Sequence, residues 1–127
     1  MVRRLNLEER VVLDLGFHPF AKIADHVNHA RACAYLPVDE DSVGYVTMEA
    51  ASASKPVITL TDSGGVLQLI LDGETGCVTD PDPKSIAEAI GLLYSDAARC
   101  AQMGCEARRL WDSFEVTWPN TIKKLLS

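Results

Sequence analysis

Residues 35–76 read YLPVDEDSVGYVTMEAASASKPVITLTDSGGVLQLILDGETG. A short apolar run ends here at Pro37, and an acidic loop then leads into a segment with the composition of a helix. A second apolar run, residues 56–60, is followed by the turn-forming residues 61–65. Short apolar strands that alternate with helices are typical of a parallel sheet covered by helices. The stretch therefore predicts an α/β fold.

The same alternation continues on both sides of this stretch. Gly16 ends an upstream apolar run, and Phe20, Ile23, Ala24 and Val27 fall on one face of a helix at 3.6-residue spacing. We expect strands at residues 11–15, 32–36 (fully buried), 56–60 and 77–79, and helices at 19–30, 43–54, 66–71, from 83 onward, 96–111 and 118–126. Together these elements predict one domain, residues 1–127, built as a three-layer Rossmann-like parallel sheet with helices on both faces.

Composition and charge narrow the classes of function. The net charge is −6 and no basic run exceeds two residues, which argues against nucleic acid or an anionic membrane surface as the main partner. The longest apolar run is too short to span a bilayer, and the first ten residues lack the apolar core of a signal peptide. The four cysteines match no disulfide framework. We therefore expect a cytoplasmic protein with reduced thiols.

Two acids, Asp41 and Glu49, bracket a glycine-containing segment that opens a helix. The first turn of a helix presents unpaired N–H groups and a positive dipole end, which together suit a phosphate group. Eight residues of helix span about 10–12 Å, roughly the distance from a diphosphate to its ribose. The segment predicts a nucleotide-sugar site whose phosphate-binding residues are Ser42, Val43, Gly44 and Tyr45. Taken alone, Asp41 could also be a helix N-cap, and Glu49 a solvated helix residue.

The order of these residues resembles the donor-binding, C-terminal half of retaining glycosyltransferases of the GT-B architecture, of the group 1 or family 4 type. That pattern is an acid, seven residues and a second Glu, followed by a Lys-Pro-Val strand and a Gly-Gly turn, here residues 55–57 and 64–65. The resemblance implies that Glu49 binds the ribose hydroxyls, that Asp41 is the catalytic acid that contacts the donor sugar, and that Gly64 and Gly65 border the diphosphate. It also implies that Phe17 or His18 lines the pocket of the base.

This chain departs from the pattern at two positions. Asp41 is one methylene shorter than the usual Glu, and Gln68 stands where a Glu is usual. The resemblance implies a nucleoside diphosphate sugar as donor substrate, with neither a cofactor nor a metal. It also implies that an Arg–Lys pair and an N-terminal acceptor domain precede the region represented here, and that the complete enzyme associates peripherally with a membrane. Without them, we expect the chain to self-associate and not to turn over donor. The alternatives are a non-catalytic nucleotide-sugar-binding or assembly module and a GT-B-like nucleotide-sugar epimerase.

Overall fold

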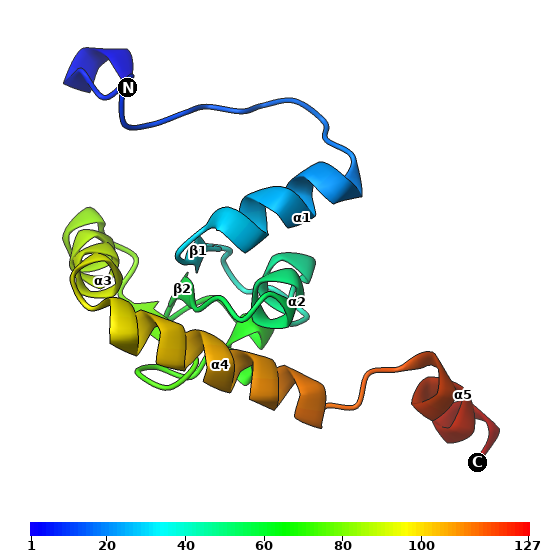
Figure 1. Ribbon diagram of the computed structural model, residues 1–127. Coiled ribbons are helices and arrows are strands. Elements are labelled where there is room, and N and C mark those ends of the chain that lie inside the picture. The colour runs from blue at the N-terminus through cyan, green and yellow to red at the C-terminus, as the bar shows by residue number, and fades with distance from the viewer.

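A three-stranded parallel sheet forms the centre of the protein in the computed structural model, which describes residues 1–127 (Figure 1). Its strands are β1 (Cys33–Ala34), β2 (Val57–Leu60) and β3 (Gly76–Thr79), side by side in that order. Cys33 lies opposite Val57, and Val57 opposite Gly76. The predicted strands at 56–60 and 77–79 are thus confirmed to within a residue at each end.

Five α-helices and two 3-10 helices complete the chain. The α-helices are α1 (Phe20–His29), α2 (Tyr45–Ser52), α3 (Pro83–Ser95), α4 (Ala97–Ser113) and α5 (Trp118–Leu126), and the 3-10 helices are η1 (Arg3–Leu5) and η2 (Gly65–Gln68). All five predicted long helices are present, while the expected short helix at 66–71 is the 3-10 helix η2. None of the helices is both long and apolar enough to cross a bilayer.

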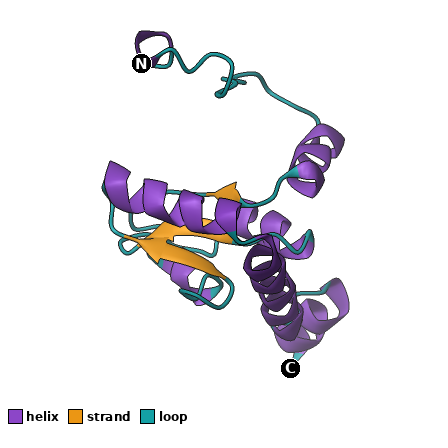
Figure 2. Ribbon diagram, turned by 60° about the vertical axis from the view of Figure 1, so that its left-hand side comes forward, coloured by secondary structure: helices purple, strands orange, loops and turns teal.

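The central strand β2 is buried over its whole length, and its side chains alternate between two cores. Val57 packs in one core with Ala50 and Ala51 of α2 and Ala107 of α4. On the opposite side of the sheet, Ile58 packs with residues of α3 and α4, namely Ala89, Leu93, Cys100 and Met103. Figure 2 shows helices on both sides of the strands. The predicted three-layer α/β arrangement is confirmed.

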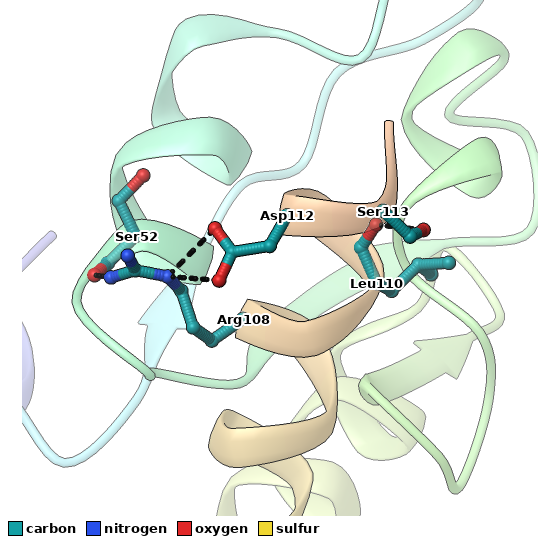
Figure 3. Close-up of polar contacts among 5 residues, drawn as sticks. All are labelled: Ser52, Arg108, Leu110, Asp112 and Ser113. Carbon is teal, nitrogen blue, oxygen red and sulfur yellow. Dashed lines mark hydrogen bonds and ion pairs between the residues drawn. The ribbon is translucent and has the colours of Figure 1, made fainter. Parts of the chain in front are cut away.

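Helix α4 crosses the edge of the sheet at which the strands begin. Arg108 of α4 donates a hydrogen bond of 2.6 Å from Nη1 to the carbonyl oxygen of Ser52, at the end of α2 (Figure 3). Asp112 holds the same guanidinium group, with both carboxylate oxygens 2.9 Å from Nε. Nearby, the Sγ of Cys100 lies 3.4 Å from the carbonyl oxygen of Arg31, just before β1. Loops form the opposite edge of the sheet, where the strands end.

The predicted strand at residues 11–15 is wrong. These residues have no regular structure, and Val12 and Leu15 are 88% and 91% exposed. Figure 1 shows the first residues, coloured blue, lying apart from the sheet and leading to the start of α1. A strand requires a neighbour to receive its backbone hydrogen bonds, and none of the three strands pairs with this segment.

The predicted buried strand at residues 32–36 is also too long and too buried. Only Cys33 and Ala34 are paired, Cys33 is half-buried, and Ala34 is exposed. The physical reason is that β1 lies at the edge of the sheet, with β2 on one side and no strand on the other. Helix α2 is likewise shorter than the expected 43–54, because Gly44 has φ +70° and Ser54 has φ +55°, which are not helical values.

Candidate functional site

The loops that follow β1 and β2 meet at the carboxyl edge of the sheet, where α/β proteins bind ligands. Three hydrogen bonds join them. The hydroxyl of Ser63 donates to the carbonyl oxygen of Pro37 at 3.0 Å, the N–H of Asp39 to the oxygen of Asp62 at 2.8 Å, and the N–H of Gly65 to the oxygen of Glu40 at 2.6 Å. The acidic loop and the Gly-Gly turn are therefore one unit.

The two glycines of the turn are needed for this contact. Gly64 has φ +66°, and a Cβ there would lie 2.6 Å from the carbonyl oxygen of Glu40. A Cβ on Gly65 would lie 2.8 Å from the carbonyl oxygen of Ser42. Both distances are too short for any side chain, so the turn can approach the acidic loop only where side chains are absent. The structure thus brings Gly64 and Gly65 against Ser42 and its neighbours, as the sequence predicts.

The segment from Asp41 to Thr47 carries a row of free backbone donors. The N–H groups of Asp41, Ser42, Val43, Tyr45, Val46 and Thr47 have no acceptor within the chain, and that of Gly44 has only the Ser42 Oγ at 3.3 Å. By contrast, side chains of Asp82, Asp96 and Thr117 accept from the first turns of α3, α4 and α5. Free donors at the start of α2, together with its dipole, suit an anion such as a phosphate.

The carboxylate of Asp41 is exposed beside these donors and makes no hydrogen bond or ion pair. Its neighbour Glu40 differs, because one of its oxygens accepts a hydrogen bond of 2.9 Å from the hydroxyl of Tyr35. Asp41 is therefore available to a ligand and adjoins the free donors, while the exposed carboxylate of Asp39 in the same loop is also unbonded.

Glu49 lies on the second turn of α2 and is half-buried. It lines a cavity of about 310 Å³ between α1 and α2, together with residues that include Phe20, Val27 and Met48. Because residues 41–44 are not helical, only the run from Tyr45 to Glu49 follows the helix rise, about 6 Å. The span of about 10–12 Å, which treats all eight residues as helical, therefore does not apply here, although both acids flank the same row of donors.

The structure does not bring Phe17 to this region. Phe17 is 98% exposed, and His18 is held within its own segment, with Nε2 2.6 Å from Asp14 and Nδ1 3.1 Å from the Nζ of Lys22. The hydrogen bond from His18 lowers the pKa of Asp14. The aromatic residue on the cavity is instead Phe20, which sequence reasoning assigned to the helix face alone. Its proximity to Glu49 is not visible in the sequence, since it depends on how α1 lies against α2.

Negative charge dominates this edge. Five acids lie in the two loops and on α2: Asp39, Glu40, Asp41, Glu49 and Asp62. The loops themselves, residues 37–44 and 61–65, contain neither Lys nor Arg. No group of three or more His, Cys, Asp or Glu side chains is arranged to hold a metal ion. A larger cavity of about 880 Å³ lies between the 71–75 loop and α4, and it shares no residue with this edge. An anion here would be bound by backbone N–H groups and the Ser42 hydroxyl, without a Lys or Arg side chain from the two loops.

Comparison with known proteins agrees with this geometry. The family described as glycosyl transferases group 1 matches residues 1–96. One relative is the GDP-mannose-dependent alpha-(1-6)-phosphatidylinositol monomannoside mannosyltransferase of Mycolicibacterium smegmatis, 34% identical over 117 residues, which are 85% of this chain and 30% of that protein. A second is the D-inositol 3-phosphate glycosyltransferase of Kineococcus radiotolerans, 33% identical over 123 residues, 90% of this chain and 28% of that protein. The chain thus spans less than a third of either relative.

Solved structures show the same arrangement. HepE of Anabaena, in complex with UDP, superposes with a TM-score of 0.84 at 27% identity, covering 98% of this chain and 34% of that protein. Sucrose-phosphate synthase of Thermosynechococcus elongatus superposes with a TM-score of 0.76 at 25% identity, covering 98% of this chain and 32% of that one. The fold is that of the C-terminal domain of a GT-B glycosyltransferase, and the chain belongs to the group 1 glycosyltransferases.

Proposed function

We propose that this chain is the donor-binding half of a retaining glycosyltransferase and binds a nucleoside diphosphate sugar at the carboxyl edge of its sheet. The free N–H groups of residues 41–47 would receive the diphosphate, and Glu49 would accept hydrogen bonds from the ribose hydroxyls. Asp41 would contact the transferred sugar. The observation that carries the proposal is the row of unpaired donors, which begins where the acidic loop packs on the Gly64–Gly65 turn and runs from Asp41 toward Glu49.

The names of similar proteins support this class of substrate. HepE of Anabaena has been crystallised with UDP and with UDP-glucose, and the mycobacterial relative is named as dependent on GDP-mannose. UDP-glucose and GDP-mannose are both nucleoside diphosphates joined to a sugar. The base therefore differs among similar proteins, and we propose the diphosphate and the ribose as the parts of the donor that this edge recognises.

We further propose that residues 1–127 alone do not transfer sugar. Negative charge builds up on the nucleoside diphosphate as it leaves. Electrostatic stabilisation of such a charge is usually the largest contribution to catalysis. The two loops of this edge supply backbone dipoles but no Lys or Arg side chain. The five acids of the edge would repel the negative charge of the leaving group. Cationic groups from outside these residues, together with an acceptor-binding domain, would complete the enzyme.

The oxidation state of the four cysteines is relevant to the cellular compartment of the protein. All four are free, and burial raises the pKa of the thiols of Cys33, Cys77 and Cys100. Unpaired thiols are usual in the reducing cytoplasm, and we propose that compartment. In denaturant without reductant, all four thiols should react with a thiol reagent, and recovery of two or fewer would contradict this part of the proposal.

Isothermal titration calorimetry with UDP and GDP tests the proposed function. The unaltered chain should bind at least one of them, and Glu49→Ala should weaken that binding by about tenfold or more, because hydrogen bonds to a charged acceptor are lost. Glu88→Ala is the control, since Glu88 is an exposed acid of α3, remote from the edge. Absence of binding by the unaltered chain, or equal affinity of the Glu49→Ala and Glu88→Ala variants, would contradict the proposal.

A further inference from the structure

We propose that Tyr35 and Glu40 form a positioning pair, in which Tyr35 contacts both ends of the segment 41–43 and holds its N–H groups in place for the donor diphosphate. This inference rests on the proposed function of the edge. Neither residue is expected to touch the ligand. Their role is to fix the loop that carries Asp41 and Ser42.

The backbone of Tyr35 is anchored to the sheet. Its N–H donates to the carbonyl oxygen of Ile58 at 3.0 Å, which extends the pairing of β1 with β2 by one residue. Ile58 is buried in the core formed with α3 and α4. The side chain of Tyr35 therefore starts from a fixed point, although the loop that follows it is irregular.

One contact of the Tyr35 side chain is with Glu40, directly before the segment. The hydroxyl donates a half-buried hydrogen bond of 2.9 Å to Oε2 of Glu40. The backbone of Glu40 is held separately, because its carbonyl oxygen accepts from the N–H of Gly65 and it pairs with Gly64 in an isolated parallel bridge. Glu40 thus links β1, through Tyr35, to the Gly-Gly turn after β2.

The second contact is with Gly44, directly after the segment. A Cβ on Gly44 would lie 2.7 Å from Cε1 of Tyr35, so the ring packs directly on the backbone at the start of α2. Thr47 strengthens this end, since its hydroxyl donates to the carbonyl oxygen of Gly44 at 2.9 Å. One aromatic side chain therefore fixes residues 40 and 44, and the three residues between them have few conformations left.

Protonation of Tyr35 keeps the contact in place at neutral pH. The hydrogen bond to Glu40 raises the pKa of Tyr35 above its ordinary value, with desolvation as the second cause. The phenol is therefore protonated, and a donor to Glu40, at neutral pH. Glu40 is the ionisable group that faces the phenol oxygen, and no Lys or Arg side chain is bonded to either residue.

Amide exchange tests the positioning role without a ligand. In Tyr35→Phe, the amide protons of Gly65 and Met48, which donate to the carbonyl oxygens of Glu40 and Gly44 at the two ends of the segment, should exchange at least about fivefold faster. Those of β2 and β3 should keep their rates, because a net hydrogen bond is lost only at the loop. Tyr94→Phe is the matched control, since Tyr94 is exposed on α3 and its hydroxyl makes no hydrogen bond. Glu40→Gln keeps an acceptor for the phenol and should preserve slow exchange. Unchanged rates in Tyr35→Phe would overturn the proposal.

Nucleotide affinity distinguishes positioning from general stabilisation. If residues 41–44 hold the diphosphate and Glu49 the ribose, Tyr35→Phe should weaken UDP binding about fivefold and UMP binding about twofold or less, with Glu40→Gln close to the unaltered chain. Where GDP is the tighter ligand, GDP and GMP replace UDP and UMP. Equal losses for both nucleotides would overturn the positioning role. If the unaltered chain binds no nucleotide, the proposed function fails, and amide exchange alone decides whether Tyr35 fixes the loop.

Discussion

Gly104 packs directly against the backbone of Ser54, so closely that a Cβ on Gly104 would overlap the carbonyl oxygen of Ser54. This contact lets α4 cross the edge of the sheet at which the strands begin, and Ser54 cannot move away because it leads into β2. Gly104→Ala should therefore lower the free energy of unfolding by about 2 kcal/mol or more, as overpacking of a rigid contact does.

Gly91 is the control for this prediction. It also lies inside a helix, α3, but a Cβ there would meet nothing within 4 Å. Gly91→Ala should raise the free energy of unfolding by about 0.5–1 kcal/mol, because alanine favours the helix. Urea denaturation followed by circular dichroism measures both changes. Destabilisations of similar size in the two variants would show that the contact with Ser54 is unimportant.

Ser63 joins three parts of the carboxyl edge through one oxygen. Its Oγ accepts from the hydroxyl of Thr59 at 2.8 Å and from the N–H of Leu60 at 3.0 Å, while it donates to Pro37. Ser63→Ala leaves these buried groups without a partner and should lower the free energy of unfolding by about 1–3 kcal/mol. Ser95→Ala removes an exposed hydroxyl on α3 and should stay within about 0.5 kcal/mol of the unaltered chain. Thermal unfolding that does not separate the two variants would contradict the assignment.

Ionisation of Tyr35 should be visible at alkaline pH. The hydrogen bond to Glu40 raises the pKa of Tyr35 in the folded state, so the fold favours the protonated phenol. Its contribution to stability is therefore fully present below the unfolded-state pKa and is lost as the pH rises through the folded-state pKa. The difference in ultraviolet absorbance between the unaltered chain and Tyr35→Phe isolates this titration. A midpoint at or below the value of free tyrosine would contradict the hydrogen bond.

Self-association is expected from the apolar side chains that no part of the chain covers. On α5, Trp118, Leu125 and Leu126 are 80%, 79% and 83% exposed, and β1 has no strand on its outer side. Unpaired strand edges and exposed apolar faces pair with other chains. Light scattering should show a dimer or larger species, and replacing Leu125 and Leu126 by Lys should reduce its mass. A monomer at all concentrations would contradict this expectation.

Much of the fold could be predicted, because local patterns determine the elements that lie inside the sheet and on its faces. Residues 56–60 are apolar except for Thr59, and residues 57–60 become the buried strand β2. Residues 11–15 have a similar composition but form no strand, since strand formation depends on a neighbour that the local sequence does not reveal. The strand predicted at 32–36 is present as β1 but is shorter and more exposed than expected, because an edge position is a property of the whole sheet.

The candidate site was predictable in part. The acids Asp41 and Glu49 and the Gly64–Gly65 turn follow from the order of residues, and the structure brings the turn and the acidic loop into contact. The contacts of Tyr35 with Glu40 and Gly44 were not visible, because they depend on how the chain folds back between β1 and α2. The position of Phe20 beside Glu49 likewise depends on the packing of two helices. Tertiary contacts of this kind leave no periodic signal in the sequence.

Mapping a nucleotide onto the backbone tests the central claim most directly. In two-dimensional NMR spectra of the labelled chain, titration with UDP or GDP should shift the amide signals of Ser42, Val43 and Tyr45, whose N–H groups have no acceptor in the chain. The signal of Gly65 should also move, whereas that of Arg99, at the cavity beside α4, should stay in place. Shifts confined to the residues around Arg99, or no shift at a saturating concentration of either nucleotide, would contradict donor binding at the carboxyl edge.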